Sequence, residues 1–79
     1  MISYLKNTPV RDLIRALEED GFSYRRRKGS QRVYRHADGR RVVLHYHHAK
    51  DTLPLGTLKS FLDGTNWTEQ DLKRLRLID

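Results

Sequence analysis

The dipeptide Asp38-Gly39, which separates two runs of strand-like residues, is the sequence feature that most constrains the fold. An Asp-Gly pair in this setting is one of the strongest short signals for a β-hairpin, because both central positions of the favoured two-residue turn need a positive φ angle. We therefore expect a tight turn at Asp38-Gly39, preceded by a strand over residues 31–36 and followed by a strand over residues 40–46.

A second turn is predicted at Gly29-Ser30, so that a strand over residues 22–28 joins the same antiparallel sheet. Successive side chains of a strand point to opposite faces of a sheet. On the last strand, one face should therefore carry Val42, Leu44 and Tyr46, and the other Arg41, Val43, His45 and His47. We expect the histidine face to be the one in contact with solvent.

Helical spacing of apolar residues predicts a first helix over residues 9–19. Thr8 is suited to cap the free amides of its first turn, and Pro9 loses no hydrogen bond at the first helical position. Gly21, which follows Asp20, is suited to the left-handed conformation that closes a helix. The apolar stripe of this helix consists of Val10, Leu13, Ile14 and Leu17.

Two further helices are expected after the strands. Pro54 opens one that Asp63-Gly64 should end, and its predicted apolar stripe consists of Leu55, Leu58, Phe61 and Leu62. The other begins where Thr68 can cap and Asp71 favours the positive end of the helix dipole. We expect its Leu72 and Leu75 to face inward, with Trp67 anchoring it to the rest of the chain.

These elements predict an α+β fold of the order α-β-β-β-α with a short extra C-terminal helix. A chain of 79 residues has room for one domain. We expect residues 1–64 to form its main part and residues 65–79 to be a helical extension of the same domain.

Composition narrows the class of protein further. The chain has no cysteine, which excludes disulfides and thiolate metal sites and suits a reducing compartment. It shows neither a signal peptide pattern nor a run of about 18 apolar residues, so we expect a cytoplasmic protein with no membrane segment. Sixteen Lys and Arg against ten Asp and Glu give a formal net charge of +6, which favours nucleic acid or an acidic protein as partner.

Several short motifs carry a family resemblance. In chain order they are Asp20-Gly21-Phe22, Arg27-Lys28-Gly29-Ser30, Arg40-Arg41-Val42-Val43, Lys50-Asp51 and Leu55-Gly56-Thr57-Leu58-Lys59-Ser60. In this order and spacing, over about residues 8–62, the chain resembles the HicA-type (YcfA-like) mRNA interferase toxins. The resemblance implies a double-stranded-RNA-binding-domain-like fold, cleavage of mRNA without a metal cofactor, and neutralisation by a HicB-like antitoxin.

One position departs from the family pattern. The family has its catalytic histidine directly after the Gly-Ser pair, where this chain has Gln31. A glutamine amide can donate and accept hydrogen bonds and so hold a phosphate, but it cannot exchange a proton near neutral pH as an imidazole does. Gln31 is therefore not the base.

Other histidines are candidates to replace the missing one. Metal-free cleavage of RNA needs a base for the ribose 2′-hydroxyl, an acid for the leaving oxygen, and cations near the phosphorane. His45 and His47 should share one face of a strand, and His36 lies in the same predicted hairpin. His47 also matches a histidine that the family often carries at the end of this strand. We predict His36, His45 and His47 as the catalytic candidates.

Other interpretations of these histidines stay open. Each of them could simply contact phosphate or solvent. Because imidazole is a common metal ligand, the run from His45 to His48 with Asp51 nearby could also form a metal site.

The RNA-binding candidates are basic or polar residues of the hairpin region, together with one lysine near the start of a helix. They are Arg26, Arg27, Lys28, Ser30, Gln31, Arg32, Arg35, Arg41 and Lys59. Most belong to a concentration of positive charge suited to a phosphate backbone, which consists of the run from Arg25 to Lys28 together with Arg32, Arg35, Arg40 and Arg41 on the neighbouring strands. Tyr24, Tyr34 and Tyr46 alternate with these cations and could stack on bases, although tyrosines of a small sheet are also common core residues.

The leading hypothesis is an endoribonuclease toxin whose basic surface binds mRNA and is covered by an acidic antitoxin. The first alternative is a non-catalytic RNA-binding module that lost its nuclease activity with the histidine after Ser30. The second is a protein-interaction domain whose positive charge serves only to bind an acidic partner.

Overall fold

A computed structural model describes residues 2–29 and 31–79, without the side chains of residues 26–28. The elements in chain order are α1 (Ile2–Leu5), α2 (Val10–Glu19), β1 (Ser23–Lys28), β2 (Gln31–Arg35), β3 (Arg41–His45), α3 (Leu55–Thr65) and α4 (Glu69–Arg74). The predicted α+β order of helix, three antiparallel strands and two helices is confirmed, and α1 is an element that the sequence patterns did not predict.

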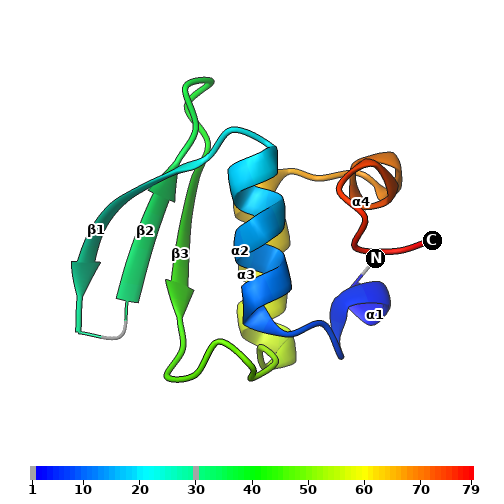
Figure 1. Cartoon of the computed structure of the whole chain (residues 1–79), viewed down its shortest axis with the longest axis horizontal. Coiled ribbons are helices and arrows are strands. Elements are labelled where there is room, and N and C mark those ends of the chain that lie inside the picture. Colours follow the sequence, from blue (N-terminus) through cyan, green and yellow to red (C-terminus); the bar gives the residue numbers. More distant parts are fainter. Residues whose placement is uncertain (1, 30) are drawn as a thin grey trace.

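The strands form one antiparallel sheet in the order β1-β2-β3, and both long helices cover the same face of it. Figure 1 shows α2 and α3 against the sheet, with α1 and α4 on the far side of these two helices. None of the helices in residues 2–29 and 31–79 lies over the opposite face of the sheet, and we call it the open face. None of the helices within the described residues is long and apolar enough to cross a bilayer.

The core lies between the sheet and the helices, as the apolar periodicity predicted. Its buried side chains include Val10, Leu13, Ala16 and Leu17 of α2, Leu58, Phe61 and Leu62 of α3, and Tyr34, Val42 and Leu44 of the sheet. The prediction that Leu55 belongs to this stripe is wrong, because its side chain is 59% exposed at the first position of α3.

The start of α2 is held by the loop that follows β3, and not by the predicted Thr8 cap. Pro9 is the N-cap residue, and no side chain caps this end of the helix. Instead, the amides of Val10 and Arg11 donate to the carbonyl oxygens of Asp51 and Ala49, at 2.8 and 2.9 Å. Since free amides at a helix start must find acceptors, these bonds fix the loop after β3 against α2.

The turn between β2 and β3 is one residue longer than predicted. Of the turn residues 37–39, only Gly39 has a positive φ angle, of 101°, so the two-residue turn that needs a positive φ at both central positions does not form. The amide of His36 donates to Arg40 O at 2.9 Å, and the amide of Gly39 donates to His36 O at 3.0 Å. Asp38 favours this three-residue loop, because its Oδ1 accepts from the amide of Arg40 at 3.1 Å.

The prediction that Asp63-Gly64 ends α3 is also wrong. The helix continues to Thr65, and Asn66 takes the left-handed conformation after it, with a φ angle of 57°. Gly64 lies inside the helix, where a Cβ atom would be 2.8 Å from the carbonyl oxygen of Arg41. This glycine therefore allows α3 to approach β3 closely, and does not act as a helix stop.

The C-terminal segment packs onto the same core. Thr68 caps α4 in a capping box with Asp71, as predicted. The ring of Trp67 packs edge-on against that of Phe61, with ring centroids 5.5 Å apart, and its Nε1 donates to the Asp20 carboxylate at 2.8 Å. The predicted anchoring role of Trp67 is confirmed, and its indole links this segment to the end of α2.

The carboxylate of Asp20 also forms ion pairs with Arg40 and Arg74, at 3.1 and 2.9 Å. Burial acts to raise the pKa of Asp20. The hydrogen bonds from Trp67 and Arg74, together with the charges of Arg40 and Arg74, outweigh burial and hold that pKa below its usual value.

Candidate functional site

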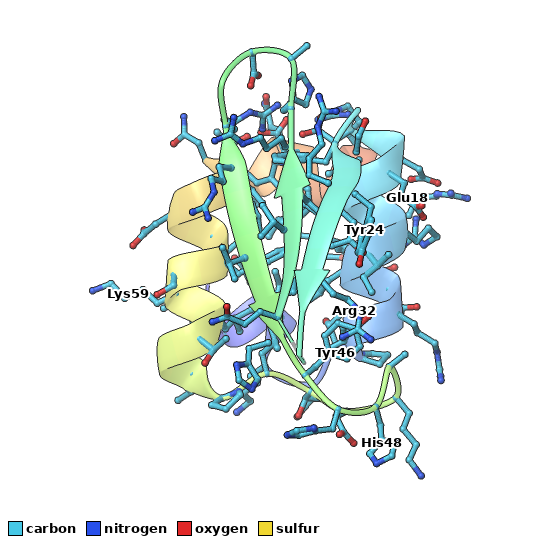
Figure 2. All side chains as sticks on the ribbon, turned by 90° about the vertical axis from the view of Figure 1, so that its left-hand side faces the viewer. Glu18, Tyr24, Arg32, Tyr46, His48 and Lys59 are labelled. Carbon is cyan, nitrogen blue, oxygen red and sulfur yellow. The ribbon has the colours of Figure 1, made fainter. Side chains whose placement is uncertain are left out.

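The open face of the sheet carries most of the described residues that the sequence predicted to be functional. Alternation along the strands places Gln31, Val33 and Arg35 of β2 on this face, together with Arg41, Val43 and His45 of β3. The complementary residues Tyr34, Val42 and Leu44 are buried against the helices. Figure 2 views the molecule from the open face.

At one end of the open face, His45 lies directly opposite Gln31. The two residues are register partners in the β2–β3 pair, so their Cβ atoms are about 5 Å apart. The ring of His47 lies edge-on to that of His45, with ring centroids 5.9 Å apart, and both side chains are exposed. We call Gln31, His45 and His47 the histidine end. The predicted co-facial placement of the two histidines is confirmed.

His36 does not join this group. Arg35 pairs with Arg41 at the other end of β2, which is roughly 13 Å from Gln31 at about 3.3 Å per residue, and His36 lies one residue beyond that end. Its Nε2 donates to Asp20 O at 2.7 Å, and its Nδ1 accepts from the amide of Asp38 at 3.1 Å. The ring also packs edge-on against Phe22. Because both ring nitrogens have backbone partners, His36 holds the turn in shape and is poorly placed to transfer protons to a substrate.

Three arginines gather at that other end of the open face. Arg25, Arg35 and Arg41, one from each strand, line a shallow hollow of about 310 Å³ together with Val33. We call these three arginines the arginine end. The sequence analysis named Arg35 and Arg41 as individual binding candidates, and Arg25 only as part of the basic run of residues 25–28. Its placement depends on a bulge between Tyr24 and Arg26 that no sequence pattern indicated.

Arg32, a predicted RNA-binding residue, faces the helices and not the open face. Its guanidinium lies 4.2 Å from the centroid of the Tyr46 ring. Figure 2 shows Arg32, Tyr46 and Tyr24 on the side of the sheet toward α2. Arg32 is thus separated by the sheet from Gln31 and His45.

The interleaved tyrosines also lie on the helix side. Tyr34 is buried, so the core alternative is the correct one for this residue, while Tyr24 packs edge-on against it and is 49% exposed. Burial, followed by the neighbouring Tyr46 and Glu18, raises the pKa of Tyr34 to about 12.

Lys59 lies apart from the histidine end. Figure 2 shows its side chain extending from α3 away from the sheet. It lines a different hollow, of about 390 Å³, whose other residues include Ile2, Leu62 and Trp67. The structure therefore does not bring Lys59 together with the histidines.

Three of the remaining predicted residues, Arg26, Arg27 and Lys28, lie on β1. The backbones of Arg27 and Lys28 pair with Arg32 and Gln31, which places this basic run beside the histidine end. The side chains of Arg26, Arg27 and Lys28, and the whole of Ser30, lie outside the described residues. Their predicted contacts with RNA stay predictions.

The metal-site interpretation of the histidine run finds no cluster to support it. Within residues 2–29 and 31–79, no three His, Asp or Glu side chains come together as a set of metal ligands. His48 lies in the loop after β3 (Figure 2), where its carbonyl oxygen accepts from the amide of Asp51 at 3.0 Å.

A comparison with protein-family models decides the family. The model described as the HicA toxin of bacterial toxin-antitoxin systems matches residues 10–67, from the first residue of α2 to Trp67. The chain belongs to the HicA toxin family. The resemblance drawn from the short motifs is thereby confirmed, and membership implies an antitoxin as partner. No curated protein matched the sequence. The family assignment directs attention to the histidine end, because the resemblance implies a catalytic histidine at the position where this chain has Gln31.

Proposed function

We propose that this HicA-family chain is a metal-independent endoribonuclease that cleaves mRNA, with His45 and His47 as its acid and base. The observation that carries this proposal is the register of β2 and β3, which sets His45 directly across from Gln31. The position that lacks the family's histidine therefore has an imidazole as its cross-strand neighbour, and the second imidazole of His47 is in contact with the first.

The chemistry follows from this arrangement. One imidazole removes the proton of a ribose 2′-hydroxyl, whose oxygen attacks the adjacent phosphorus. The bond from phosphorus to the 5′-oxygen breaks, and the other imidazole, protonated at the start, gives its proton to that oxygen. The products are a 2′,3′-cyclic phosphate and a 5′-hydroxyl. The amide of Gln31 donates a hydrogen bond to a phosphate oxygen, and the basic run of β1 stabilises the negative charge of the phosphorane.

The antitoxin is expected to be HicB-like and to act by covering this surface. The open face carries Arg35 of β2 and Arg41 and His45 of β3, and no acidic residue belongs to either of these described strands. An acidic partner would therefore complement the face electrostatically and block access of RNA to the histidine end.

The direct test is cleavage of a defined RNA by the purified chain in the presence of EDTA. We expect fragments that end in a 2′,3′-cyclic phosphate, and no cut where the ribose at the cleaved bond is replaced by 2′-deoxyribose. Cleavage that requires added metal, or cleavage that persists at the 2′-deoxy position, would contradict the mechanism.

The alternative function is an RNA-binding module without nuclease activity, and Gln31 is the residue that favours it. Folded protein that binds RNA with a steep salt dependence but leaves it intact would support this alternative. Substituting Gln31→His then separates the two functions. In a nuclease the variant should cleave at least as fast as the parent chain, whereas in a module that lost its activity it should gain cleavage from none.

A further inference from the structure

The arginine end concentrates like charge in a way that folding does not require. Arg35 and Arg41 are direct cross-strand partners, and Arg25 completes the group from β1. Like charges directly opposite each other destabilise a sheet. Such an arrangement is understandable where an anion binds between the charges.

Several other arginines of the chain form ion pairs with acidic side chains. Arg40 and Arg74 pair with Asp20, and Arg76 pairs with Glu19. Among the described residues, by contrast, no ion pair and no side-chain hydrogen bond engages Arg25, Arg35 or Arg41. Their guanidinium groups are thus available to an external acceptor.

Local backbone geometry builds the hollow between these side chains. Tyr24 pairs with Tyr34 and Arg26 with Val33, so that β1 has one more residue than β2 in this stretch. The extra residue is Arg25, and a bulge of this kind redirects a side chain. Val33, only 8% exposed, forms an apolar floor. The floor limits hydration of the three guanidinium groups and so strengthens their attraction for an anion.

The hollow is too far from the histidine end to hold the phosphate that is cleaved. Four residues along β2 separate the levels of Arg35 and Gln31, which is roughly 13 Å. The two ends nevertheless lie on one continuous face, with Val33 and Val43 between them. A single-stranded RNA in extended conformation that lies along β2 and β3 is long enough to contact both the arginine end and the histidine end.

We propose that the hollow formed by Arg25, Arg35, Arg41 and Val33 binds a backbone phosphate of single-stranded RNA other than the one that is cleaved. This proposal rests on the proposed function for the role of the bound RNA. The guanidinium groups donate hydrogen bonds to the phosphate oxygens, and the contact sets the register of the strand relative to His45 and His47. Substrate length thereby becomes a determinant of affinity.

Binding is tested without relying on cleavage. The ligand is a fluorescent single-stranded oligonucleotide in which every ribose is 2′-O-methylated, so that no 2′-hydroxyl can attack. We expect Arg35→Ala and Arg41→Ala each to weaken binding about tenfold, since a hydrogen bond to a charged group is lost. The slope of log affinity against log salt should fall by about 0.7 for a phosphate no longer neutralised.

Lys73→Ala is the matched control, because it removes the same charge from an exposed position on α4. If the arginine variants bind the oligonucleotide no more weakly than Lys73→Ala does, the hollow is not an RNA site. The same conclusion follows if they bind RNA normally and lose affinity only for an acidic antitoxin.

A cleavage assay adds the length dependence. Arg35→Ala should raise KM for an oligonucleotide that spans both ends of the face and leave cleavage of a dinucleotide unchanged, because a dinucleotide cannot reach the hollow. Equal losses for both substrates would overturn the proposal. If the wild-type chain cleaves neither substrate, the nuclease proposal fails, and the 2′-O-methyl binding result still decides whether the hollow holds RNA.

Discussion

Histidines lie near both ends of the open face, but their surroundings differ. Near the arginine end, the imidazole of His36 has a backbone partner at each ring nitrogen and packs on Phe22. At the histidine end, the rings of His45 and His47 are exposed, contact each other, and lie opposite Gln31. Residue type alone therefore does not identify a catalytic histidine. What matters is how exposed the ring is and which residues stand beside it.

The strongest way to break this comparison is to remove a histidine from the histidine end. His47→Ala should lower the rate of RNA cleavage by a factor of about 10² to 10⁴, the usual contribution of a general acid or base. His48→Ala, one residue along in the loop, is the control and should cleave like the parent chain. Equal activity of the two variants in a cleavage assay would remove His47 from the mechanism.

Substituting Asp20 tests how much its contacts, which lie near the arginine end, contribute to the stability of the fold. Asp20→Ala leaves Arg40, Arg74 and the Trp67 indole without their shared partner, so the free energy of unfolding should fall by roughly 2–3 kcal/mol. For a domain of this size, Tm should drop by about 10 °C or more, measured by circular dichroism.

The depressed pKa of Asp20 also gives this contribution a pH dependence. Stability from the carboxylate is present above the unfolded pKa, near 4, and is lost as the pH falls through the lower folded pKa. Asp20→Ala should therefore be less sensitive to acid over this range than the parent chain. An identical loss of stability in both proteins would assign acid sensitivity to other groups.

Tyr34 is buried on the helix side of β2, and its titration should make the stability of the fold depend on pH at high pH. Its pKa is raised to about 12, so its contribution is complete below pH 10 and is lost as the pH rises toward 12. The expected loss is roughly 2 kcal/mol, observed by denaturant titration. Tyr34→Phe should flatten this part of the curve, and an unchanged slope would show that Tyr34 is not responsible.

The smallest expected effect belongs to His36. Replacing it with Ala removes two hydrogen bonds and a ring contact, and should cost about 1–2 kcal/mol of stability. Under conditions where the variant is fully folded, its affinity for the 2′-O-methyl oligonucleotide should be unchanged. Weaker binding by a folded His36→Ala protein would place this histidine in contact with RNA.

Much of the fold could be predicted because local patterns and tertiary packing agree. Helical spacing placed Leu13, Leu17 and Leu58 in the core, and strand alternation placed Val42 and Leu44 there. Predictions failed where the decisive contact came from a distant part of the chain. Gly64 looks like a helix stop, but its role depends on the backbone of Arg41.

In the candidate site, too, local patterns predicted some features, while others depend on contacts between distant parts of the chain. The shared face of His45 and His47 follows from strand periodicity, whereas the pairing of His45 with Gln31 required the register of the β2–β3 hairpin. The sequence placed His36 in the same hairpin, but it could not show the contact of its ring with the carbonyl oxygen of Asp20, which lies 16 residues away in sequence. The placement of Arg25 beside Arg35 and Arg41 could not be predicted, because a bulge is not encoded by any simple period.

The most direct test of the central claim compares two histidine variants on one RNA. Single-turnover cleavage is measured with EDTA present for His45→Ala and His36→Ala, each at a temperature where circular dichroism shows folded protein. The account predicts that His45→Ala loses at least about a hundredfold in rate while His36→Ala retains the rate of the parent chain. Full activity of His45→Ala together with loss of activity in His36→Ala would contradict it, and would move the catalytic centre to the other end of the sheet.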